Sequence, residues 1–281
     1  MPTYETLEPI VVRLGLGLVA ANVRITAGDR KSTTVEVRPA DTSNKSDVRI
    51  AEQTRVEYAD GRLEVTAPKR GSLFGRSGSL DVTIALPSGS RLHGEIGMGD
   101  LVCEGRLGEC RFKTGLGQIR LDAAGPVTLN SGMGDITVEL AEGDAEITAG
   151  SGAVSVRRID GSATVKNSNG ASWLGEVAGD LQVKASNGSI MIDRAHAGVS
   201  AKTANGSVRI GEVARGAVTL ETSAGSVEVG IRTGTAAWLD LKTAAGRVRN
   251  ELSAAAGPDD TDEKVEVRAR THVGDVVVHR V

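Results

Sequence analysis

Aromatic residues are scarce in this sequence, and their scarcity limits the kind of core that it can form. Phe, Trp and Tyr make up only 2% of the 281 residues, although 40% of the residues are hydrophobic. Aromatic side chains supply much of the buried area of thick cores. A core built almost without them is filled by Val, Ile, Leu and Ala, which favours a thin core between strands over a helical or sandwich core.

Signals for membranes, secretion and nucleic acid are also missing. The apolar run from Ile10 to Ala21 contains Arg13 and is much shorter than the roughly 20 apolar residues of a membrane helix. The first residues, MPTYETLEP, lack the basic start of a signal peptide. A formal net charge of −3 does not favour nucleic acid. Together with only two cysteines, these features predict a cytoplasmic protein that neither inserts into a membrane nor binds nucleic acid.

Glycine, in contrast, is abundant and regularly spaced. The sequence has 36 glycines, and short units such as GMGDL at 97–101, GLGQI at 115–119 and SNGSI at 186–190 repeat one pattern. Successive anchoring glycines of these units are 18, 17, 18, 18, 18, 18 and 19 residues apart, at Gly99, Gly117, Gly134, Gly152, Gly170, Gly188, Gly206 and Gly225. Looser copies follow at Gly246 and Gly274. So regular an interval is typical of stacked repeats.

Each repeat contains two short stretches in which aliphatic residues alternate with other residues. Positions two and four residues after an anchoring glycine are apolar in nearly every copy, with Ser172 and Asn250 as exceptions. A second alternating stretch precedes the next glycine. Alternation with period two indicates half-buried strands. A turn glycine, at which we expect a positive φ, comes before the second stretch in most copies: Gly108, Gly125, Gly143, Gly161, Gly179, Gly198 and Gly216.

The two stretches predict an all-β fold, a parallel β-solenoid (β-helix) in which about 18 residues form one coil. Equivalent strands of successive coils would stack about 4.8 Å apart, so that each aliphatic residue lies above its counterpart. General chirality predicts right-handed coiling. An antiparallel sandwich is the weaker alternative, because it has no reason to keep the columns in register.

The two ends of the chain depart from the period. Residues 1–90 carry strands without it, including a hairpin around Asp60-Gly61, and we expect them to form an irregular β cap that covers the solenoid of residues 91–281. The stretch 253–264 is expected to be a loop insertion. Val276, Val277 and Val278 lie in the last strand, where an uncapped edge would invite pairing with another copy.

At this point the sequence resembles a known family. The segment SLFGRSGSLDVTIALPSGSRL at 72–92, followed by GMGDL-type repeats, is similar to the bacterial β-strand-repeat family called the Toastrack domain, also labelled "putative adhesin", a domain of unknown function. The resemblance covers nearly the whole chain. It implies a β-helical scaffold with no assigned chemistry, and membrane-attached relatives that are linked to cell-envelope stress signalling.

Motifs for catalysis, cofactors and metals are missing from the sequence. The four histidines, His93, His196, His272 and His279, occupy different positions in the repeat, and no nucleophile elbow, HExxH or Walker A sequence is present. The acidic stretch at 259–263 lacks EF-hand spacing. Cys103 and Cys110 fall on inward columns of one coil and are interpreted as small buried side chains, with a redox or metal role as the alternative. We therefore expect no enzyme, no cofactor and no metal.

The outward positions are the better candidates for function. Lys166, Lys184 and Lys202 stand four residues before three successive anchoring glycines, and acidic side chains stack on the other strand at Glu104, Asp122 and Glu139. These ladders are either solvated strand faces or docking sites for a charged partner. Trp173 and Trp238 lie at outward positions, where an exposed ring is a contact candidate. A local register slip that buries Trp173 is the alternative.

The function that the sequence favours is that of a non-catalytic cytoplasmic scaffold that binds an unidentified protein through these ladders. A link to cell-envelope stress or to membrane-associated signalling complexes is implied by the resemblance. The alternative is a self-assembling structural protein that forms homo-oligomers through its C-terminal edge. A carbohydrate-active enzyme on a β-helix is the least favoured interpretation.

Overall fold

The computed structural model describes residues 2–68, 78–252 and 263–281, and these form an all-β parallel solenoid. The predicted fold class is confirmed. The chain divides into two compact units, residues 1–142 and 143–281, and each unit is described by itself. One short helix, α1 (Lys45–Gln53), lies in the first unit.

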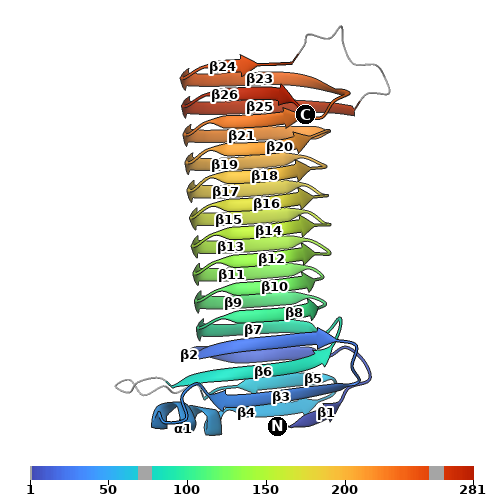
Figure 1. Cartoon of the computed structure of the whole chain (residues 1–281), viewed down its shortest axis with the longest axis vertical. Helices are drawn as coiled ribbons and strands as arrows, with labels where there is room; N and C mark the ends of the chain where they lie inside the picture. The colour runs from blue at the N-terminus through green and yellow to red at the C-terminus, as the bar shows by residue number, and fades with distance from the viewer. Residues whose placement is uncertain (1, 69–77, 253–262) are drawn as a thin grey trace. The chain divides into compact units, whose positions relative to one another are not determined.

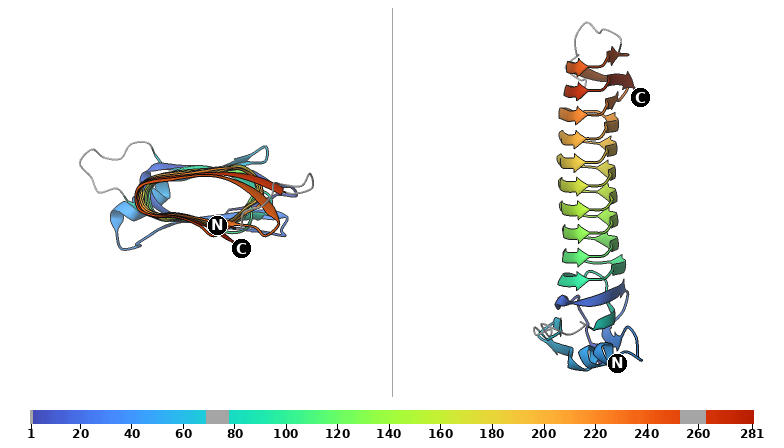
Figure 2. Two further views of the ribbon diagram at one scale, coloured as in Figure 1. Left: turned by 90° about the horizontal axis from the view of Figure 1, so that it is seen from above. Right: turned by 90° about the vertical axis from the view of Figure 1, so that its left-hand side faces the viewer.

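The second unit consists of coils in which two strands alternate (Figure 1). One sheet contains β13 (Ala145–Ser151), β15 (Ala163–Asn169), β17 (Leu181–Asn187), β19 (Val199–Asn205) and β21 (Gly216–Ala224), each parallel to the next. The other contains β14 (Val154–Ile159), β16 (Ser172–Val177), β18 (Ile190–Ala195), β20 (Val208–Val213) and β22 (Val227–Ile231). Seen from above in Figure 2, successive coils superimpose, as the period of the glycines requires.

The second unit ends in an order that the sequence did not indicate. The last coil of the chain, β25 (Glu263–Val273) and β26 (Val276–Arg280), lies between β21 and β22 on one side and β23 (Thr235–Ala245) and β24 (Val248–Asn250) on the other. The prediction of an open edge at Val276, Val277 and Val278 is therefore wrong: β26 pairs along both of its edges, and Val276 and Val278 are fully buried. Most of the loop expected at 253–264 lies outside the described residues, although Glu263 and Lys264 already belong to β25.

One strand of the first unit forms a whole coil. β2 (Val11–Gly28) is 18 residues long. One edge of β2 pairs with β7 (Arg91–Met98) and β8 (Leu101–Arg106), and its other edge with β5 (Arg62–Thr66) and β6 (Ser79–Pro87). Four further parallel strands complete the coils of this unit: β9 (Cys110–Leu116), β10 (Ile119–Ala124), β11 (Val127–Met133) and β12 (Ile136–Ala141).

Antiparallel strands and the helix cover β5 and β6. β1 (Thr3–Glu5) pairs with β3 (Ser32–Pro39), β3 with β6, and β4 (Arg55–Ala59) with β5. The predicted hairpin is confirmed, with Asp60 and Gly61 at φ of 50° and 72°. Asp47 of α1 accepts a 3.0 Å hydrogen bond from the backbone N–H of Ser79, which attaches the helix to β6.

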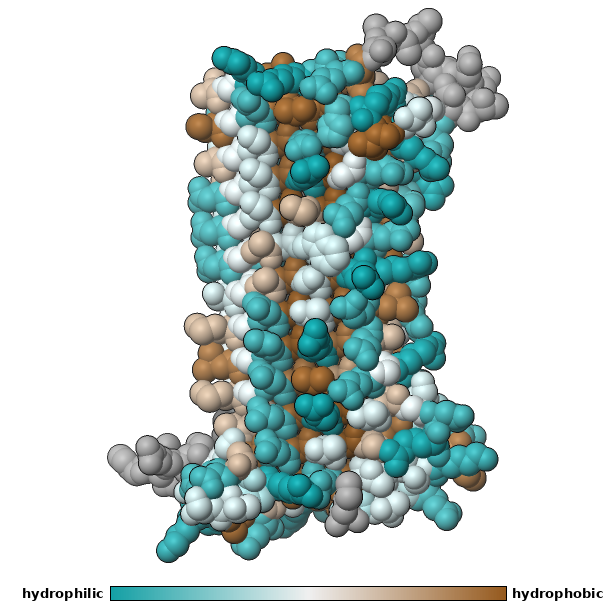
Figure 3. Space-filling view, in the orientation of Figure 1, coloured by the Kyte–Doolittle hydropathy of each residue, from teal (hydrophilic) through white to brown (hydrophobic). Residues whose placement is uncertain are grey.

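The aliphatic columns form the core between the two sheets. In the second unit, Val154, Ile190 and Val208 are each at most 1% exposed, and so is Ser172, the exception in this column. The register places Ser172 inward, beside Val154 and Ile190, and the buried amide of Asn167 donates to its Oγ at 3.4 Å. On the face drawn in Figure 3, mostly hydrophilic and neutral side chains point outward, and apolar residues are visible between them.

The two sets of glycines are needed for different reasons. Gly188, an anchoring glycine, has a φ of 150°, and a Cβ there would collide with the carbonyl oxygen of Gly170 in the preceding coil. Turn glycines were expected to have positive φ as well, but of the seven only Gly216 does, with a φ of 91°. The expectation is wrong for Gly108, Gly125, Gly143, Gly161, Gly179 and Gly198. A Cβ on Gly179 would lie 2.8 Å from the backbone of Gly161, so close approach between coils excludes a side chain there.

Candidate functional site

The three predicted lysines form one column on the second unit. Lys166 of β15 lies beside Lys184 of β17, and Lys184 lies beside Lys202 of β19. All three are exposed. Neighbouring strands are about 4.8 Å apart, so the three lysine side chains leave the backbone at about that interval along the column. We refer to Lys166, Lys184 and Lys202 as the basic column.

Neutral side chains surround the basic column. The other outward positions of β15, β17 and β19 are occupied by Thr164, Ser168, Gln182, Ser186, Ser200 and Ala204. At one end, Nζ of Lys202 lies 2.9 Å from a carboxylate oxygen of Glu221. Among the described residues, neither Lys166 nor Lys184 has an ion pair. Stacked like charges oppose folding slightly. At Lys166 and Lys184 the column carries positive charge that the fold itself does not neutralise.

The acidic residues of the first unit do not form an equally regular column. A register shift between β8 and β10 follows Leu121, and Gly105 has a φ of 82° at this point. Asp122 accepts a 3.0 Å hydrogen bond from the backbone N–H of Gly105. Glu104 pairs with Arg24 of β2 at 3.2 Å. Glu139 lies on β12, next to the strand that carries Asp122. Glu139 also interacts within the fold, so all three predicted carboxylates have partners there.

The two tryptophans have different surroundings, both within the second unit. Trp173 keeps the register, beside Ser155 and Met191, so the alternative of a register slip is wrong. Its indole N–H donates to both carboxylate oxygens of Asp193, at 3.1 and 3.2 Å, and the ring is half-buried. Trp238 is 57% exposed, with the guanidinium of Arg268 5.9 Å from the ring centre. Trp238 is therefore the better contact candidate.

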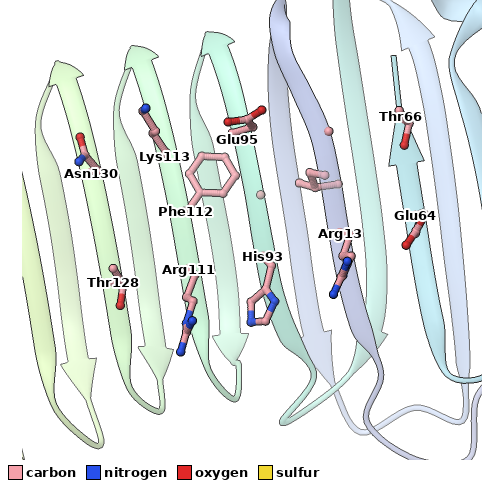
Figure 4. A pocket seen from close by; sticks show the side chains of 13 residues that line it. Arg13, Glu64, Thr66, His93, Glu95, Arg111, Phe112, Lys113, Thr128 and Asn130 are labelled. Atoms are coloured by element: carbon pink, nitrogen blue, oxygen red, sulfur yellow. The ribbon is translucent and has the colours of Figure 1, made fainter. Parts of the chain in front are cut away.

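A groove that the sequence did not indicate lies on the first unit (Figure 4). It has a volume of about 600 Å³. Two rows of outward residues run across its strands. One row contains Glu64, Arg13, His93, Arg111 and Thr128, and the other contains Thr66, Gly15, Glu95, Lys113 and Asn130. Gly15 lacks a side chain, which leaves the second row hollow. Both rows cross β5, β2 and β7, which lie side by side in the sheet. The repeats of the sequence do not indicate that these three strands are neighbours.

Charges of both signs line the groove. Glu109, next to it, lies 2.6 Å from Arg111 and 3.3 Å from Nε2 of His93. Partial burial works to raise the pKa of the Glu109 carboxyl, but hydrogen bonds from His93 and Arg111 outweigh it, so the pKa is lowered. The hydrogen-bonding partner of His93 is therefore a carboxylate, whereas a histidine that acts as a catalytic base would contact the hydroxyl group that it activates. The groove offers donors and acceptors to a polar ligand but no excess of one charge.

The cysteines and histidines are not arranged as a metal site. Cys103 and Cys110 are free and buried, and burial raises the pKa of the Cys110 thiol to about 12. In the second unit, His196 lies 2.8 Å from Glu176. Within residues 2–68, 78–252 and 263–281, no group of three or more His, Cys, Asp and Glu could hold a metal ion. The described part of the chain also contains no helix long and apolar enough to cross a membrane.

Comparison with known proteins gives a family match. The family model described as Toastrack DUF4097 matches residues 13–280, and no curated protein matches the sequence. The chain is similar to a solved "putative adhesin" from Bacteroides fragilis, with 15% identity over 99% of this chain and 95% of that one, and a TM-score of 0.35. It is also similar to a solved "putative lipid binding protein" from Parabacteroides distasonis, with 13% identity over 99% of this chain and 96% of that one, and a TM-score of 0.32. Likenesses this distant carry no argument about what the chain binds.

Proposed function

Because the chain belongs to the Toastrack DUF4097 family, which has no assigned chemistry, we propose that it is a non-enzymatic scaffold that binds an acidic surface of another protein. The basic column supports this proposal most directly. It presents three lysines in register on a flat strand face, with no carboxylate at the other outward positions of the same three strands.

The chemistry of the column favours an acidic protein surface. Ammonium groups on flexible stems tolerate varied geometry, so the column suits a surface with several carboxylates better than one small anion. Exposed charge pairs contribute about 0.2–1 kcal/mol each. Three pairs therefore add roughly 0.6–3 kcal/mol, which is about a threefold to 150-fold change in affinity. Other contacts supply the remaining affinity, and the column sets where the partner docks.

The cytoplasm is the proposed compartment. The free, buried thiols of Cys103 and Cys110 support a reducing environment. A complex that acts in cell-envelope stress signalling is the proposed setting, by analogy with membrane-attached relatives. Fractionation of the native cells checks the compartment, and recovery of the full chain in the periplasmic or secreted fraction contradicts it.

The experiment that tests the scaffold is capture of the partner followed by measurement of its affinity. The full chain is used to capture proteins from lysate of the native organism, and the retained protein is purified and titrated. We expect Lys166→Glu, Lys184→Glu and Lys202→Glu together to weaken binding at least about tenfold, or about 1.4 kcal/mol. The triple Lys→Arg variant is the matched control, because it keeps the charges.

Salt dependence separates this docking mode from an apolar one. The Debye length falls from about 10 Å at 0.1 M salt to about 3 Å at 1 M, so binding through the basic column weakens across that range. Affinity that changes neither with salt nor in the triple Glu variant, while circular dichroism shows an unchanged fold, rules out the basic column as the docking site.

A further inference from the structure

The outermost strand of the second unit has an edge that is open among the described residues. β23 pairs in parallel with β25 along eleven residues, with Leu239 beside Val267 and Leu241 beside Ala269. No described strand pairs with the other edge of β23. Backbone N–H and C=O groups along such an edge form a template for a further strand. At this end of the unit the fold therefore leaves a sheet that can be extended.

The core is also incompletely covered at this end. Leu239 and Leu241 point inward, yet they are only half-buried, and Val248 of β24 is 46% exposed. One coil further in, Val267, Ala269 and Val276 are each 0% exposed. A further layer over β23 and β24 would bury the same apolar side chains, at roughly 25 cal/mol for each Å² removed from water.

The sequence of β23 is complementary to itself when two copies run antiparallel. With Leu241 opposite Leu241 of the second copy, Asp240 of each copy faces Lys242 of the other. Side chains directly opposite each other lie on the same face of a sheet, so the two leucines meet on the core side and both charge pairs form on the outer side. Leu239 then faces Thr243, and the exposed ring of Trp238 faces the small Ala244.

The surrounding contacts allow these charge pairs to form. Asp240 already accepts a 3.2 Å hydrogen bond from Arg270 through one oxygen, Oδ2, and a carboxylate has capacity for further donors. Lys242 is exposed and has no ion pair among the described residues. The register that pairs opposite charges is also the register that pairs the apolar residues.

We propose that β23 pairs antiparallel with β23 of a second copy, which joins two chains end to end as a closed dimer. A two-fold contact of this kind uses the same surface on both copies, so assembly stops at two chains. This inference goes beyond the proposed scaffold function and does not depend on it, because the basic column lies on β15, β17 and β19, away from the strand edge that pairs.

A charge exchange in β23 tests the dimer and its register. The full chain, of 29.1 kDa, is measured by sedimentation equilibrium from low to high micromolar concentration. We expect a dimer for the wild type and at least about a tenfold higher dissociation constant for Asp240→Lys and for Lys242→Asp, because each variant places like charges opposite each other. An equimolar mixture of the two variants is expected to form a mixed dimer, since both lysines of one chain then face both aspartates of the other.

The proposal is overturned by a wild-type chain that stays monomeric at every concentration, by dimers that persist unchanged in both variants, or by a mixture that does not associate. Dimers that form only after residues 253–262 are replaced by a Gly-Ser linker would also overturn it, because the chain itself would then occupy the edge. If Asp240→Lys does not fold, Lys242→Asp decides alone. The triple Lys→Glu variant of the basic column is the control and should dimerise like the wild type.

Discussion

The side-chain amide of Asn187 donates a 2.9 Å hydrogen bond to Oδ1 of Asn169 in the preceding coil, and Asn205 donates a bond of the same length to Asn187. These three residues occupy one turn position, each directly before an anchoring glycine. Their spacing predicts a ladder of amides from coil to coil, and the structure confirms it. A ladder of this kind adds side-chain hydrogen bonds to those of the strands.

Loss of the central amide should therefore cost more than loss of the last one. Asn187→Ala removes two of these bonds and Asn205→Ala removes one. Net hydrogen bonds contribute about 0.5–1.5 kcal/mol each, and these are exposed, so we expect about 1 kcal/mol or less per bond. Urea unfolding shows which variant is less stable. A midpoint of Asn205→Ala as low as that of Asn187→Ala contradicts the ladder.

A second, inward ladder was not predicted from the sequence. Thr203 donates to the carbonyl oxygen of Gly188 at 3.0 Å, and Thr222 donates to that of Gly206 at 2.8 Å. Each threonine stands three residues before an anchoring glycine and bonds to the anchoring glycine of the preceding coil. The signal was present, because most copies have a hydrogen-bonding side chain here: Thr114, Ser131, Asn167, Thr203, Thr222, Thr243 and Thr271.

Thr222→Val tests this inward ladder. Valine keeps the shape of threonine but removes the donor to Gly206, and a buried carbonyl that loses its donor costs about 1–3 kcal/mol. Thr219→Val is the matched control, because Thr219 lies outward on the same strand, and we expect it to change the free energy of unfolding by less than about 0.5 kcal/mol. Equal effects of the two changes in urea unfolding would refute the role of the hydroxyl.

The side-chain amide of Asn167 donates to backbone carbonyls in two coils. This can be tested by supplying one of the two hydrogen bonds from another residue. Its amide nitrogen lies 3.1 Å from the carbonyl oxygen of Gly152 and 3.0 Å from that of Gly170. In the pattern of the other coils, the side chain at position 185 would donate to the carbonyl oxygen of Gly170, but Ala185 has no donor. We expect Asn167→Ala to destabilise more than Thr222→Val, because two carbonyls lose a donor. Adding Ala185→Thr should recover part of the loss, and no recovery would show that the second bond contributes nothing.

The repeats could be predicted from the sequence because each coil pairs with its neighbours in sequence. The spacing of the anchoring glycines is then also the spacing of the coils, and it placed Lys166, Lys184 and Lys202 in one column. The ends break this rule, since β2 lies between β5 and β7, and β25 lies between β21 and β23. Such pairings leave no period, so neither the groove around Arg13 nor the open edge of β23 could be found from the repeats.

The two cysteines should be unreactive in the folded protein. Burial raises the pKa of Cys110 to about 12 and that of Cys103 well above its usual value, and the thiolate is the reactive form of cysteine. At pH 8 we expect a thiol reagent to label neither residue in the native chain and both in urea. Rapid labelling of the native chain would contradict the buried positions. Labelling as slow as unfolding agrees with them.

Glu109 should make the stability of the protein depend on pH. Although partial burial opposes the change, hydrogen bonds from His93 and Arg111 hold its pKa below the usual 4.5 in the folded chain. A carboxyl with a lowered pKa binds protons less readily when folded, so its contribution to stability is present above about pH 4.5 and is lost as the pH falls through the folded value. The free energy of unfolding of Glu109→Gln should therefore fall less steeply than that of the wild type below pH 4.5. Arg111→Met, which removes one of the two partners, should lie between them, and parallel curves for all three proteins would show that these hydrogen bonds do not stabilise the carboxylate.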